Sequence, residues 1–104
     1  MAHKARNSIG VVGAGTMGAG ITQAAAAAGW SVVLYDIEQT LVDQASESIA
    51  NRFLRLVKKN RITEEEATSC QEQITTTISV DDLAHCDLVI EAIVEDFDIK
   101  VKVL

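Results

Sequence analysis

A glycine-rich turn directly after an apolar run constrains the fold of this chain more than any other feature. Residues 8–12 are rich in β-branched side chains, and Gly13, Gly15 and Gly18 follow with the spacing G-x-G-x-x-G. In such a motif the first glycine turns the chain out of a strand, the second lets a pyrophosphate approach the backbone, and the third lets a helix lie close to the sheet. The free N–H groups of that helix's first turn then face the phosphates. The predicted phosphate-binding turn consists of Gly13, Ala14, Gly15, Thr16, Met17 and Gly18.

An acidic residue makes this interpretation more specific. Asp36 closes the next apolar run, residues 32–35, near the offset of about 20 residues that dinucleotide-binding units show. A carboxylate there can accept hydrogen bonds from both hydroxyls of an adenosine ribose, and it would repel a 2′-phosphate. The neighbours Ile37 and Glu38 supply no cation. The site therefore favours NAD over NADP. The alternative for Asp36 is a helix N-cap before Glu38.

The rest of the chain alternates between strand and helix patterns. We expect strands at residues 8–12, 31–36, 74–78 and 88–93, helices at 16–28, 39–59 and 63–73, a brief turn or helix at 79–82, and a last helix from about residue 96. Gly29 and Asn60 end the first two helices, and Thr63 opens the third with a capping box to Glu66.

This alternation predicts an α/β fold with right-handed crossovers and a parallel sheet. The expected order places the first strand centrally, the second and third on one side, and the fourth on the other. We interpret residues 8–104 as the first half of a Rossmann-type doubly wound sheet plus one strand, truncated, after a loose head at 1–7. Without a neighbour, the fourth strand would expose an apolar edge, so we expect self-association.

Composition excludes several kinds of partner and site. A chain of 104 residues is one domain or less. Its net charge of −6 argues against general binding to nucleic acid or membrane surfaces, and no apolar run approaches the length of a transmembrane helix. Cys70 and Cys86 lack metal-ligand spacing, so we expect no metal site and two reduced thiols of a cytoplasmic protein without a signal peptide.

Charged residues outside the turn have open or structural interpretations. Arg52, Arg55 and Lys59 share one face of the second helix, which is either a solvated face or a surface for a phosphate-rich ligand. His85 precedes the fourth strand and so lies at the edge opposite the ligand edge, where we expect no catalytic role. Glu91, in mid-strand, needs a partner.

Three sequence blocks together resemble a known family. Residues 9–21, 33–36 and 87–95, with the basic stretch 55–62, are similar to the N-terminal part of 3-hydroxyacyl-CoA dehydrogenases, including bacterial 3-hydroxybutyryl-CoA dehydrogenases. Many dehydrogenases share the first block alone, and the combination is much more specific. The resemblance runs from about residue 8 to the end of the chain.

The resemblance implies roles for individual residues. Residues 13–18 would hold the NAD pyrophosphate and Asp36 the adenosine ribose. Ala92, Glu95 and Lys100 match positions on the nicotinamide side, whereas Lys59 matches a contact to coenzyme A. Arg52 stands where the family has a second coenzyme A contact, a serine.

It also implies an activity that this chain does not carry alone. The family transfers a hydride from C3 of a 3-hydroxyacyl-CoA to NAD in fatty acid β-oxidation, and its catalytic residues and its dimer-forming helical domain follow the segment that ends here at Leu104. We therefore expect no catalytic residue in this chain, no activity from it alone, and a homo-oligomeric parent. The alternatives are another hydroxyacid dehydrogenase of the same superfold, or a stand-alone NAD-binding or redox-sensing module.

Overall fold

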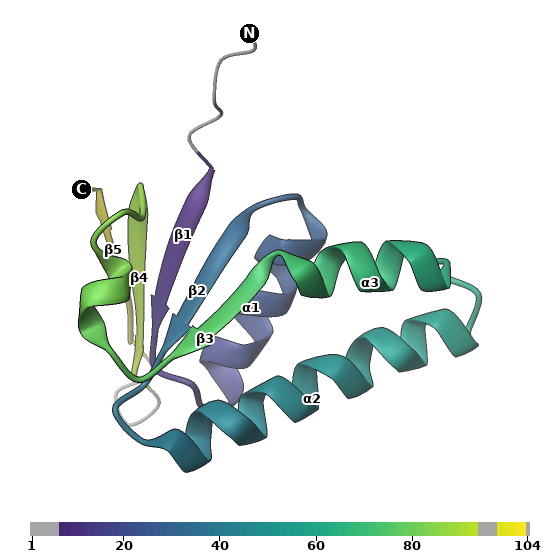
Figure 1. Cartoon of the computed structure of the whole chain (residues 1–104), viewed down its shortest axis with the longest axis horizontal. Coiled ribbons are helices and arrows are strands. Elements are labelled where there is room, and N and C mark those ends of the chain that lie inside the picture. The colour runs from purple at the N-terminus through teal and green to yellow at the C-terminus, as the bar shows by residue number, and fades with distance from the viewer. Residues whose placement is uncertain (1–6, 94–97, 104) are drawn as a thin grey trace, which may run out of the picture.

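The computed structural model describes residues 7–93 and 98–103 and shows a mostly parallel, Rossmann-type sheet with α-helices against it (Figure 1). The elements are β1 (Ser8–Val12), α1 (Thr16–Ala27), β2 (Ser31–Tyr35), α2 (Gln39–Lys58), α3 (Glu64–Glu72), β3 (Ile74–Thr77), the 3-10 turn η1 (Val80–Leu83), β4 (Leu88–Ile93) and β5 (Asp98–Val103). Up to β4, these bounds agree with the expected ones to within one or two residues. Of the predicted head, only Asn7 falls in the described ranges.

The strand order is the predicted one with a strand added. The sheet runs β3-β2-β1-β4-β5, and the first four strands are parallel. In its centre, Val11 of β1 lies between Leu34 of β2 and Ile90 of β4. Because the strands are parallel, the carboxyl ends of β1, β2 and β4 meet at one edge, which we call the carboxyl edge. This register brings the glycine turn and Asp36 together.

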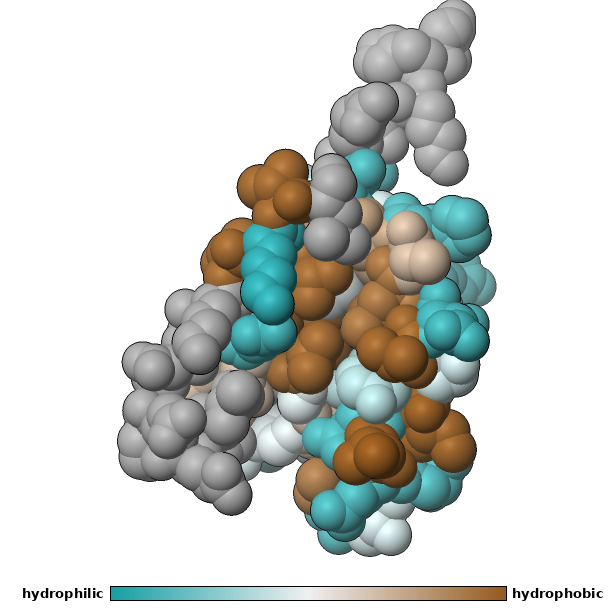
Figure 2. All heavy atoms as spheres, turned by 90° about the vertical axis from the view of Figure 1, so that its left-hand side faces the viewer, coloured by the Kyte–Doolittle hydropathy of each residue, from teal (hydrophilic) through white to brown (hydrophobic). Residues whose placement is uncertain are grey.

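The two faces of the sheet are covered unequally. The α-helices pack on the face that carries Ile9 and Val11, and α2 and α3 are seen to the right of the strands in Figure 1. The core there consists of Ile9, Val11, Ala14, Ala19, Ala26, Val32, Leu34, Val42, Ala45, Ile49, Phe53 and Ala67. The opposite face is covered by a smaller cluster of Leu83, Cys86 and Val89. Apolar side chains also remain at the surface on the face that Figure 2 shows, which is the left-hand side of Figure 1. In β5, Val101 and Val103 are 57% and 80% exposed.

Two helix ends follow local sequence signals. Asn60, just past α2, has a φ of 58°, the left-handed conformation that ends helices. Thr63 opens α3 with the predicted capping box, since its Oγ1 accepts from the Glu66 N–H at 3.0 Å and its own N–H donates to Glu66 Oε1 at 2.8 Å. No helix in the described ranges is both long and apolar enough to span a bilayer.

The predicted last helix is wrong. Residues 98–103 instead form β5, which pairs antiparallel with β4, Leu88 opposite Val103. The reason lies in the local pattern: charged residues alternate with Ile99, Val101 and Val103, and this period of two with β-branched side chains is typical of a strand. Residues 96 and 97 lie outside the described ranges.

The pairing also overturns the expected exposed edge of β4, because β5 now occupies that position. Lys102 of β5 forms an ion pair with Glu91 of β4, with 3.2 Å between Nζ and Oε2. The mid-strand Glu91 therefore has the partner that its position demands.

A buried hydroxyl in α1 supports a stability prediction. Thr22 is 0% exposed, and its Oγ1 finds no hydrogen-bond partner in the described part of the chain. Thr22→Val keeps the shape and removes the unsatisfied group, so we expect it to raise the free energy of unfolding by about 1 kcal/mol. Urea denaturation measures this, with exposed Thr68→Val on α3 as a control that should change stability by less than about 0.5 kcal/mol. A Thr22→Val variant that is less stable than the parent would contradict the conclusion that the Thr22 hydroxyl is unsatisfied.

Candidate functional site

The first glycine of the turn is required by both its backbone and its surroundings. Gly13 has a φ of 109°, and its N–H donates to the Tyr35 carbonyl at 2.8 Å. A Cβ at this position would lie 2.3 Å from the carbonyl oxygen of Ala92. The ends of β1, β2 and β4 thus converge on Gly13, and no other residue fits there without displacing backbone.

The other two glycines differ in what requires them. A Cβ on Gly18 would lie 1.7 Å from the Gly13 carbonyl oxygen, so Gly18 lets α1 start hard against the turn, as the motif predicts. Gly15, the N-cap of α1, has φ −77° and ψ −165°, an extended conformation that any residue adopts. Backbone geometry gives no reason for glycine at 15, whereas a ligand lying against the backbone would.

The start of α1 is a suitable place for an anion. Its first turn has no acidic residue, and its N-cap, Gly15, makes no side-chain hydrogen bond to the N–H groups of that turn. The first N–H groups of a helix have no partner inside it, and they carry the positive end of the helix dipole. At Thr16, Met17 and Gly18 these donors are available to a phosphate.

Asp36 connects the glycine turn to the start of α2. Its Oδ2 accepts from the Ala14 N–H at 2.9 Å, and its Oδ1 accepts from the Glu38 N–H at 3.0 Å. The N-cap of α2 is Glu38 rather than Asp36. Each carboxylate oxygen can accept more than one hydrogen bond, so the half-buried Asp36 can still bind ribose hydroxyls. The structure thus brings together the two features that the sequence predicted to form one site.

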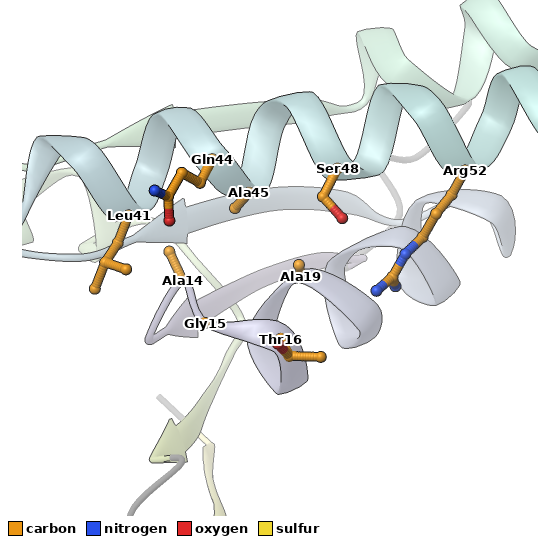
Figure 3. A pocket seen from close by; sticks show the side chains of 9 residues that line it. All are labelled: Ala14, Gly15, Thr16, Ala19, Leu41, Gln44, Ala45, Ser48 and Arg52. Atoms are coloured by element: carbon orange, nitrogen blue, oxygen red, sulfur yellow. The ribbon is translucent and has the colours of Figure 1, made fainter.

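A hollow of about 250 Å³ extends from the turn along the seam between α1 and α2 (Figure 3). It is lined by Ala14, Gly15, Thr16, Ala19, Leu41, Gln44, Ala45, Ser48 and Arg52. Gln44, Ser48 and Arg52 lie above α1 in the close-up. The sequence interpretation missed Gln44 and Ser48, although the spacing of four residues between them and Arg52 places all three on one helix face.

Arg52 does not lie on a fully solvated face, which was one of the two interpretations open for it. Its Nη1 donates to Oε1 of Gln23 on α1 at 3.3 Å, and it is half-buried, whereas Arg55 and Lys59 are exposed. The reason is tertiary: α1 packs against this side of α2, and the guanidinium lies beside Gly20 of α1, where a Cβ would be 3.6 Å from Nη1. The structure places Lys59 at the C-cap of α2.

The remaining candidate residues are placed as follows. Ala92 is buried at the carboxyl edge, with its carbonyl against Gly13. Lys100 lies in β5 opposite Glu91, and Glu95 falls outside the described residues. His85 is exposed at the opposite edge, where its carbonyl accepts from the Ser8 hydroxyl at 3.2 Å.

Neither cysteine adds a nucleophile to the site. Cys70 and Cys86 are both free thiols, and Cys86 is buried under the sheet face opposite the α-helices. Burial raises the pKa of the Cys86 thiol, and the neighbouring charge of Asp87 raises it further. The thiol therefore stays protonated and unreactive.

Comparison with known proteins identifies the family. Residues 8–104 match the model of the NAD-binding domain of 3-hydroxyacyl-CoA dehydrogenases. A 3-hydroxybutyryl-CoA dehydrogenase of Bradyrhizobium diazoefficiens is 42% identical over 91% of this chain and 32% of its own length. A 3-hydroxyadipyl-CoA dehydrogenase of Escherichia coli is 38% identical over 89% of this chain and 20% of its own.

A solved structure agrees with this assignment. The (S)-3-hydroxybutyryl-CoA dehydrogenase of Ralstonia eutropha superposes with a TM-score of 0.83 and 42% identity, over 88% of this chain and 32% of that one. The chain thus spans about a third of the length of the two 3-hydroxybutyryl-CoA dehydrogenases. The resemblance seen in the sequence is confirmed, and the geometry of the glycine turn fits the cofactor that the family model names. The chain therefore belongs to the 3-hydroxyacyl-CoA dehydrogenase family, of which it is an NAD-binding domain.

Proposed function

We propose that a protein built on this domain oxidises the 3-hydroxyl of an acyl-CoA, with NAD accepting the hydride. The observation that carries the proposal is the bond from the Ala14 N–H to the Asp36 carboxylate, which joins the phosphate-binding turn to the ribose-binding acid in a chain of this family. Bound NAD supplies the hydride acceptor, and this domain holds and orients it.

The domain binds the cofactor at the carboxyl edge. The pyrophosphate lies against the turn from Gly13 to Gly18, where the N–H groups that begin α1 donate to it. Asp36 accepts from the ribose hydroxyls, and its charge disfavours the 2′-phosphate of NADP. The residues that contact the nicotinamide end of the cofactor are Ala92, Glu95 and Lys100. The position of the Ala92 carbonyl against Gly13 supports this role for Ala92.

The substrate contacts of this domain are Arg52 and Lys59. Arg52 in α2 and Lys59 at its C-cap are cations that would bind phosphate groups of coenzyme A, and both match positions at which the family contacts coenzyme A. The acyl-CoA named in the relatives supports this substrate class. Arg52 lies in the hollow beside the cofactor turn, which would place the two ligands next to each other.

The cellular role follows from the family. We propose fatty acid β-oxidation in the cytoplasm by a homo-oligomeric enzyme that contains this domain. A net charge of −6 supports the proposal that neither nucleic acid nor a membrane surface is a partner.

A chimaera tests the activity. The chain is fused to the remaining two-thirds of the Bradyrhizobium relative and assayed with NAD and 3-hydroxybutyryl-CoA, following NADH absorbance. We expect turnover of at least about 1 s⁻¹. The 104-residue chain alone should form no NADH above the blank, because the resemblance places the family's catalytic base outside this segment. A chimaera that folds and binds NAD but does not turn over this substrate, or NADH formation by the chain alone, would contradict the proposal.

A further inference from the structure

Among the described side chains, no acid forms an ion pair with Arg52. Arg52 is the one charged residue among the nine that line the hollow between α1 and α2. Among the side chains that the structure describes, the ion pair found joins Lys102 of β5 to Glu91 of β4, and neither residue lines this hollow. Half-buried Arg52 instead donates to the neutral amide oxygen of Gln23.

This choice of partner has a chemical consequence. Buried charges are ordinarily paired, and a carboxylate would both hold a guanidinium and cancel its charge. The amide oxygen of Gln23 accepts one hydrogen bond from the guanidinium and carries no charge, so the full positive charge stays available. The guanidinium has five N–H donors in a rigid fork, so several remain for a ligand after the bond to Gln23.

The rest of the hollow suits an anion too. Its walls carry the polar side chains of Thr16, Gln44 and Ser48, and no carboxylate is among the lining residues. At the far end lies the start of α1, where the helix dipole is positive. A phosphate group in the hollow would meet a cation and hydrogen-bond donors, and none of the described residues that line it is acidic.

We propose that Gln23 is a positioning residue that fixes the Arg52 guanidinium for a phosphate of coenzyme A, and that its neutrality is what keeps that site cationic. This inference rests on the proposed function, in which Arg52 contacts coenzyme A. It assigns to α1, which carries the cofactor turn at its start, a second task in substrate binding two turns later.

Gln23→Glu separates this role from a structural one. The substitution places a carboxylate against Arg52, so the pair should be held at least as firmly and the melting temperature should stay or rise. Titration of coenzyme A into the NAD-saturated chain should nevertheless show at least about tenfold weaker binding, because the carboxylate competes with the phosphate for the same donors. Arg52→Ala should weaken binding by about tenfold to a hundredfold. Gln71→Glu on α3 adds the same charge away from the hollow and should change binding less than about twofold.

The other possible outcomes test the role of Gln23 and the contact by Arg52 separately. If Arg52→Ala weakens coenzyme A binding but Gln23→Glu binds like the parent, the role of Gln23 is overturned while the contact by Arg52 stands. If the parent chain and Arg52→Ala bind coenzyme A with equal affinity, the inference is wrong, and so is the proposed contact between Arg52 and coenzyme A. A loss of affinity for NAD instead of coenzyme A in Gln23→Glu would likewise overturn the inference, because Arg52 would then serve the cofactor.

Discussion

Gly18→Ala is expected to destabilise the chain by about 3 kcal/mol or more, although alanine favours a helix by about 1 kcal/mol over glycine. The added Cβ would lie 1.7 Å from the Gly13 carbonyl oxygen and 2.8 Å from its carbon. Both are backbone atoms of the turn, and Gly13 is itself held by its bond to the Tyr35 carbonyl and by the Ala92 carbonyl behind it. Relief would require α1 to move off the sheet, which exposes core side chains such as Ala19 and Ala26.

A second glycine of the same helix supplies the matched control. A Cβ on Gly20 would meet Arg52 Nη1 at 3.6 Å, an ordinary contact with the end of a flexible side chain. Gly20→Ala should therefore show the gain in helix propensity and raise stability by roughly 0.5–1 kcal/mol. Urea denaturation of both variants measures the difference. Equal stability of the two would show that the close approach of α1 to the turn is not what Gly18 provides.

Asp36→Ala is expected to weaken NAD binding by about 1.5–3 kcal/mol, which raises the Kd roughly 10- to 150-fold. The carboxylate provides charge-assisted acceptors for the ribose hydroxyls, and it also holds the Ala14 N–H at 2.9 Å. Preference for NAD over NADP should fall at the same time, because the charge that repels a 2′-phosphate is gone. Calorimetric titration with both cofactors measures the two effects.

Two further variants separate the two jobs of this carboxylate. Asp36→Asn keeps an acceptor oxygen for the turn but loses the charge, so it should lose discrimination against NADP while remaining as stable as the parent to within about 1 kcal/mol. Asp43→Ala removes an exposed carboxylate of α2 that accepts a hydrogen bond from the Gln39 amide, and it should leave both affinities within about twofold. Equal affinity of the parent chain for NAD and NADP would refute the role of Asp36.

Much of the fold could be predicted because its signals are local. The β-branched run before Gly13, the glycine spacing and the capping box at Thr63 each depend on residues within one turn or strand. The handedness of βαβ crossovers then leaves few possible strand orders, and the predicted one is observed for β1 to β4. The meeting of Gly13 and Asp36 follows from the same topology, since the ends of neighbouring parallel strands share an edge.

The last segment differs from the prediction for a local and a non-local reason. The last segment was predicted to be a helix, but its pairing with β4 satisfies backbone groups of both strands and places Lys102 against Glu91. Residues outside that segment supply these partners, so its own pattern, which alternates as a strand does, could indicate the strand but not what it pairs with.

The sequence by itself determined the α/β class, the glycine turn and the acid that accompanies it, because these follow from backbone sterics and the period of each element. Tertiary structure alone decided where the Arg52 side chain lies. Helical spacing grouped it with exposed Arg55 and Lys59, and only the packing of α1 on α2 turned its guanidinium to Gln23 in the hollow. The orientation of a long side chain on a helix depends on which neighbour covers that face, and that neighbour, on α1, lies 29 residues away along the chain.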